Sequence, residues 1–144
     1  MEDLSGIEKI FYKEKLLSII IRTNYKNTGV VFFTPPDSSQ QVAYMSHPKS
    51  KVIEPHIHNV VKREIYFTKE VLFIRKGKLK VNFYSDAKDF IESKVLNEGD
   101  VILLAEGGHG FEIINDVEII EVKQGPYCGE MDKVRFIPKT GYNK

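Results

Sequence analysis

Residues 70–83 read EVLFIRKGKLKVNF, and this stretch decides the fold class. Over 78–83 apolar and polar residues alternate, which is typical of a strand with one face in the core. Residues 71–75 form a nearly continuous apolar run with β-branched and aromatic members, which also favours a strand. Lys76-Gly77 lies between the two and is a turn signal. The stretch therefore predicts two strands joined by a turn.

The same pattern continues along the whole chain, where short β-prone runs alternate with turn residues. The other runs with strand character are 16–22, 30–34, 41–46, 51–58, 64–67, 101–104, 111–114 and 117–123. Many short strands with frequent turns predict an all-β barrel or sandwich. Helix is a minor component: 1–15 is expected to hold a short amphipathic helix. Residues 87–93 fit either one turn of helix or another strand.

Size and composition indicate one domain spanning 1–144. The chain has 144 residues, 42% of them hydrophobic and 28% charged, which is enough to build a single core. The net charge of +1 gives no basic excess of the kind that nucleic-acid binding requires. The single cysteine, Cys128, excludes an internal disulfide and a cysteine-based zinc cluster. The N-terminal residues lack a signal-peptide pattern and no apolar run is long enough to cross a bilayer, so a cytoplasmic protein is expected.

Three histidines and a glutamate are candidate metal ligands. In a strand, His56 and His58 would point to the same face and converge on one ion. Glu70 opens an apolar strand, where an unpaired carboxylate would be costly and a cation would balance it. His109 lies between glycines that let the backbone approach a bound group closely. Each residue alone has an ordinary explanation, and Glu64 competes with Glu70 for the role of carboxylate ligand.

Taken together, these residues resemble the two motifs of the cupin superfamily. The histidine pair of the first motif matches His56 and His58, and six residues separate Glu70 from Gly77, as the motif requires. The gap between His58 and Glu70 is longer than in the family and contains Glu64. The second motif is matched in order by Gly99, Gly107, His109 and Asn115, with Ala105 in place of its usual proline.

The resemblance covers 51–124 and implies a double-stranded β-helix, or jelly-roll barrel. It also implies one divalent transition metal held by His56, His58, Glu70 and His109. Such a ligand set suits Fe, Mn, Ni, Co, Cu or Zn, whereas Mg and Ca prefer all-oxygen shells. The resemblance leaves two functions open: a metal-dependent oxygenase or isomerase acting on a small polar or carbohydrate-like metabolite, and a non-catalytic module that binds a metal or small ligand. Tetrahedral zinc would make the site structural.

Strand parity and the resemblance together suggest which other residues line the ligand pocket. The candidate pocket residues are Tyr66, Leu72, Phe111, Glu121 and Lys123. Glu121 and Lys123 share a strand face, so they could instead pair with each other. In cupins, strands that precede the motifs often extend a sheet across a dimer interface. Residues 1–50 are therefore expected to form a homodimer, with a small molecule as the other partner and neither nucleic acid nor membrane.

Overall fold

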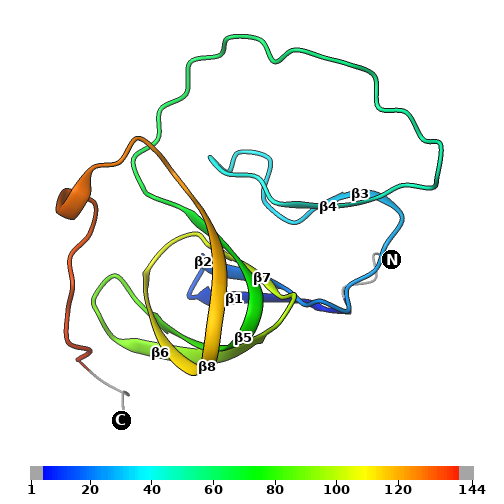
Figure 1. Ribbon diagram of the computed structural model, residues 1–144. Coiled ribbons are helices and arrows are strands. Elements are labelled where there is room, and N and C mark those ends of the chain that lie inside the picture. The colour runs from blue at the N-terminus through cyan, green and yellow to red at the C-terminus, as the bar shows by residue number, and fades with distance from the viewer. Residues whose placement is uncertain (1–4, 140–144) are drawn as a thin grey trace.

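The computed structural model describes residues 5–139 and is all-β apart from one short 3-10 helix (Figure 1). The strands are β1 (Ile7–Tyr12), β2 (Lys15–Ile21), β3 (Gly29–Phe32), β4 (Ala43–Ser46), β5 (Glu70–Tyr84), β6 (Phe90–Asn97), β7 (Val101–Leu104) and β8 (Gly108–Lys123). The 3-10 helix η1 (Gly129–Asp132) follows the last strand. The all-β expectation is therefore confirmed.

Strand β5 is the centre of the main sheet. One of its edges pairs antiparallel with β8 from Glu70↔Lys123 to Tyr84↔Gly108. Its other edge pairs with β7 near its start and with β6 near its end. β7 also pairs with β2, and β2 pairs with β1, so that all six strands form one antiparallel sheet.

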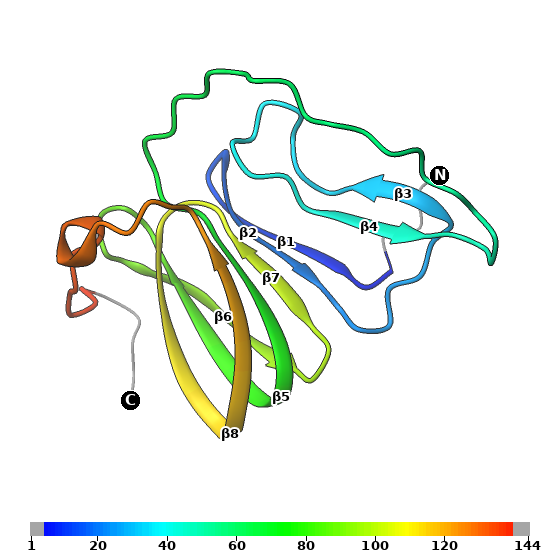
Figure 2. The same ribbon diagram turned by 45° about the horizontal axis from the view of Figure 1, so that its top comes forward.

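The sheet curls strongly into a half-barrel, as both views show (Figure 1, Figure 2). Its inner face carries the main core, in which Ile74, Leu79, Val81 and Phe83 of β5 are at most 1% exposed. Leu79, Val81 and Phe83 are the alternating apolar positions that the sequence pattern predicts to be buried. Burying one apolar face of a strongly twisted sheet on itself removes that face from water without a second layer.

A separate two-stranded hairpin, β3–β4, covers part of the outer face. Phe33 and Tyr44 lie against Tyr25, with ring centroids 5.2 and 5.1 Å from the Tyr25 ring in edge-to-face geometry. This second core also contains Ile19 of β2 and Leu103 of β7. The hairpin therefore packs on the β2–β7 side of the sheet, while β8 lies at the far edge.

The expected turn at Lys76-Gly77 is a bulge within one continuous strand. Gly77 has φ +87°, and a Cβ atom there would lie 2.0 Å from the Asp116 carbonyl oxygen. The register between β5 and β8 shifts on both sides of this point. A bulge bends a strand without ending it. Likewise, the separate strands expected at 111–114 and 117–123 are one strand, β8, bent at the same place.

The structure also corrects the helix expected at 1–15 and the strands expected at 51–58 and 64–67, and it resolves the alternative at 87–93. The described part of 1–15 contains strand β1 rather than a helix, because β1 hydrogen bonds along β2. Residues 87–93 lead into strand β6, which settles the alternative in favour of a strand. No strand forms at 51–58 or at 64–67. Residues 47–66, called the arm below, instead form an open arc between β4 and β5 (Figure 2).

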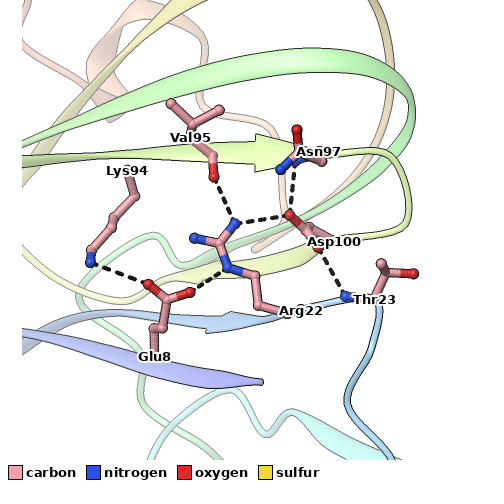
Figure 3. Close-up of polar contacts among 7 residues, drawn as sticks. All are labelled: Glu8, Arg22, Thr23, Lys94, Val95, Asn97 and Asp100. Atoms are coloured by element: carbon pink, nitrogen blue, oxygen red, sulfur yellow. Dashed lines mark hydrogen bonds and ion pairs between the residues drawn. The ribbon is translucent and has the colours of Figure 1, made fainter. Parts of the chain in front are cut away.

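The turn between β6 and β7 is fixed by a buried carboxylate. Asp100, whose side chain is 3% exposed, accepts hydrogen bonds from the backbone N–H groups of Thr23 (2.9 Å) and Asn97 (2.8 Å). It also accepts one from Arg22 Nη1 at 2.9 Å, while Arg22 Nε pairs with Glu8 (Figure 3). The strand ends of β2, β6 and β7 are thereby tied together.

Within residues 5–139, no helix is long and apolar enough to cross a membrane.

Candidate functional site at the mouth of the curled sheet

Glu70 and His109 meet at one end of the half-barrel. Glu70 is the first residue of β5, and its side chain is 12% exposed. His109 Nε2 lies 3.2 Å from Glu70 Oε2 and donates a hydrogen bond to it when that nitrogen carries the proton. In the β5–β8 ladder these residues are far apart, because Glu70 is opposite Lys123 and His109 is opposite Phe83. Only the curl of the ladder brings its two ends together.

Lys123 adds a second cation beside Glu70. Its Nζ atom lies 3.5 Å from Glu70 Oε1 and 3.4 Å from Asp132 Oδ2. Asp132 belongs to η1 and also accepts a hydrogen bond from the Thr68 hydroxyl. The segment that follows β8 is thus tied to the residues just before β5.

The charges of this cluster stabilise the ionised form of its carboxylates. The hydrogen bond from His109, together with the nearby charges of His109 and Lys123, outweighs burial and lowers the pKa of Glu70 to about 2. The Thr68 hydrogen bond is the main cause of a lowered pKa at Asp132. Burial works to lower the pKa of Lys123, but the charge of Glu70 and the bond to Asp132 raise it. Glu70 is therefore an anion throughout the physiological pH range.

A cavity of about 780 Å³ opens beside the cluster, in the size range of small-molecule sites. The described residues that line it include Phe67, Thr68, Glu70, Tyr84, His109, Phe111, Asp132, Arg135 and Phe136. The lining combines a charged end with aromatic walls. Tyr84 and Phe136 pack edge to face at 5.3 Å, so that the C-terminal segment forms one wall.

The five residues predicted to line a pocket are placed in different ways. Phe111 lines the cavity, and its ring lies 5.4 Å from that of His109. Lys123 contacts Glu70 directly, and Glu121 is exposed on β8, opposite Leu72 in the β5–β8 ladder. Leu72 is a core residue at 4% exposure. Tyr66 is 84% exposed on the arm, where its hydroxyl donates to Glu64.

His56 and His58 lie on the arm and not beside Glu70. Both residues are exposed, and their rings lie 5.3 Å apart in edge-to-face geometry. The Nδ1 atom of His56 lies 2.9 Å from the carbonyl oxygen of Glu54. Among residues 5–139, no group of three or more His, Cys, Asp or Glu residues is gathered as a metal site would require. The structure thus brings together two of the four predicted ligands, and keeps the other two next to each other elsewhere.

Thr68, Asp132 and Phe136 were not predicted from the sequence. Asp132 and Phe136 lie beyond the region that resembles cupins, in a segment without strand periodicity. No local pattern marks their role, because it depends on the C-terminal segment folding back over the cavity.

Comparisons with family models, curated proteins and solved structures found no match for this chain.

Proposed function

We propose that this chain is a cupin-type protein that binds a small polar metabolite in the cavity, with Glu70 and His109 at the centre of the site. We further propose that a divalent transition metal is held there by these two residues together with His56 and His58. With such a metal, the protein would act as an oxygenase or as an isomerase.

The observation that carries the proposal is the approach of Glu70 and His109. Each was predicted to be a ligand from a different motif, and their Nε2 and Oε2 atoms lie 3.2 Å apart. Two neighbouring donors on a six-coordinate ion, each bonded at about 2.1 Å, are separated by about 3 Å. Three imidazoles and one carboxylate are also a donor set that suits a borderline divalent ion. The chemistry and the spacing of the two donors therefore fit a metal, provided that the arm supplies the other two.

Each residue of the cluster has a task in such a site. A bound metal would supply Lewis acidity or an oxygen-binding position. Glu70 contributes a fixed negative charge, and His109 would offer its Nε2 atom as the neighbouring ligand. Lys123 offers a cation to an anionic group of the ligand. Phe111 and Phe136 exclude water from the aromatic side of the cavity.

A second candidate, a non-catalytic binding module, is favoured by one specific feature. Lys123 already lies beside Glu70 as a cation, and His109 Nε2 lies within hydrogen-bond distance of the same carboxylate. The cluster is therefore stable without a metal, and the cavity could serve for binding alone.

Elemental analysis of the purified protein tests the metal proposal. We expect close to one transition-metal ion per chain, with most of it lost in His109→Ala and in Glu70→Gln. His47→Ala is the matched control, because His47 is an exposed histidine outside both motifs. Protein that holds no metal and cannot be loaded with Fe(II), Mn(II), Ni(II), Co(II), Cu(II) or Zn(II) would refute the metal site.

The reaction class is tested separately on the metal-loaded protein. An oxygenase consumes oxygen with its substrate, whereas an isomerase works without oxygen. A binding module shows neither activity but is stabilised against heat by its ligand.

A further inference from the structure

We propose that two copies of this chain exchange their arms: the arm of each copy, residues 47–66, adds as a strand to the free edge of β8 in the other copy. Three observations support this inference: the exposed edge of β8, which is the acceptor strand; the exposed arm, which is the donor strand; and the opposite charges of the two.

The acceptor is a long, exposed strand edge. β8 has 16 residues, and within the described chain only β5 pairs with it, so that its other edge presents unpaired backbone groups. Apolar side chains are exposed on both of its faces. Phe111 and Ile113, opposite the buried Val81 and Leu79, are 42% and 56% exposed on the inner face. Ile120 and Val122 are 47% and 58% exposed on the outer face. Such an edge is an aggregation hazard unless another strand covers it.

The donor is an extended and uncovered segment. Every residue from 47 to 64 is exposed, including Ile57 at 93% and Val60 at 104%. The polar contacts of the described arm are local, such as Lys51 N to Pro48 O and the Tyr66 hydroxyl to Glu64. Pairing with another strand would satisfy the backbone groups of such a segment and remove its apolar side chains from water.

The charges of the two segments are complementary. The arm carries four basic and two acidic side chains, a net charge of +2 with neutral histidines. β8 carries four acidic side chains and one basic side chain, a net charge of −3. Opposite charges on segments that share exposed apolar residues favour their association and fix its orientation.

A second copy fits better than closure within one chain. The arm leaves β4 on the β2–β7 side and runs as an arc that stands away from β8 (Figure 1). Each chain carries one donor and one acceptor, so two copies satisfy each other about a two-fold axis. Each chain would contribute its 20 arm residues and the 16 residues of β8, which is more than the roughly 20–30 residues per side that a stable interface contains.

The exchange would also complete the proposed metal site. His109 is the second residue of β8 and lies at the mouth. An arm docked along β8 brings His56 and His58 of the partner subunit to the edge that holds His109. This second part rests on the proposed function, whereas the exchange itself does not.

Charge reversal and mixing test the exchange. The double variant Lys62→Glu/Arg63→Glu reverses the net charge of the arm, and Asp116→Lys/Glu118→Lys reverses that of β8. All four residues are exposed, so both variants should fold, which circular dichroism can check. By light scattering we expect the wild type to have the mass of two chains, and each variant to dissociate at least tenfold more readily. In a mixture of the two variants both contacts are again between opposite charges, so the dimer should return. The exchange would be overturned by a monomeric wild type, by variants that dimerise as well as the wild type, or by a mixture that does not regain the dimer. A mixture that stays dissociated would favour pairing of the arm with β8 within one chain.

Metal content of mixed variants tests the composite site. His56→Ala/His58→Ala and Glu70→Gln/His109→Ala should each bind little metal. Random pairing of the two makes half of the dimers mixed, and each mixed dimer has one complete site, so the mixture should hold about one ion per four chains. If the wild type holds metal and mixed dimers form without recovering it, all four ligands belong to one chain and the composite site is overturned. If the wild type holds no metal, the proposed function and the composite site both fail, and light scattering still decides the exchange.

Discussion

The two ends of the short strand β7 each lie next to a carboxylate that is mostly removed from water, and these two carboxylates have different kinds of partner. Asp100 immediately precedes β7 and is bound by two backbone N–H groups and by Arg22. Glu70 lies opposite Leu104, the last residue of β7, in the sheet. Its carboxylate contacts the side chains of His109 and Lys123. Asp100 is 3% exposed, whereas Glu70 is 12% exposed and lines the cavity.

The difference separates a structural carboxylate from a chemically available one. The backbone N–H groups of Thr23, just after β2, and of Asn97 in β6 cannot leave Asp100 without breaking the turns that hold the strand ends. The side chains around Glu70 can rotate or exchange a proton, so a ligand or metal can replace them. A carboxylate satisfied by backbone groups therefore indicates folding, and one satisfied by mobile side chains at a cavity indicates a site.

The largest expected effect is that of Asp100→Ala. It leaves two backbone N–H groups without their acceptor and removes one partner of the Arg22 guanidinium. We expect the free energy of unfolding to fall by about 3–5 kcal/mol, measured by urea denaturation at one protein concentration. Asp37→Ala, at an exposed turn, is the control and should change stability by less than about 0.5 kcal/mol. Equal effects of the two substitutions would mean that the Asp100 network does not fix the strand ends.

Glu70→Gln should have an intermediate effect that depends on pH. The pKa of Glu70 is about 2 in the folded state and 4.5 as the ordinary value, so the ionised group stabilises the folded state above pH 4.5. This contribution, on the order of 2 kcal/mol, is lost as the pH falls through about 2. In metal-free buffer, the difference in melting temperature between wild type and variant should therefore shrink between pH 4.5 and pH 2. A melting-temperature difference that stays constant over this range would show that the charge of Glu70 does not stabilise the cluster of Glu70, His109 and Lys123.

Lys123→Met should have the smallest effect on folding. Its side chain is 29% exposed and its ion pairs are long, at 3.4 and 3.5 Å, so the stability should change by less than about 1 kcal/mol. The pKa of Glu70, followed by NMR titration of its carboxyl carbon, should rise because one of its cations is gone. An unchanged pKa would leave His109 as the group that keeps Glu70 ionised.

Much of the fold could be predicted from local patterns. The alternation at 78–83 gave the buried face of β5, because a strand sends every second side chain into the core. The bulge at Gly77 was mistaken for a turn, since a glycine with positive φ serves both and only the pairing partner distinguishes them. The helix expected at 1–15 was wrong because pairing with β2 outweighed the local amphipathic pattern.

The candidate site was predictable in its residues but not in its assembly. The sequence by itself determined an all-β chain with strand-forming runs, and it singled out Glu70 and His109 from two distant motifs. Only the tertiary structure decided that these two meet, since they lie at opposite ends of the β5–β8 ladder and the curl of the sheet joins them. It also decided that 51–58 is not a strand in the single chain, because strand formation needs a partner edge and none is beside the arm in the described structure.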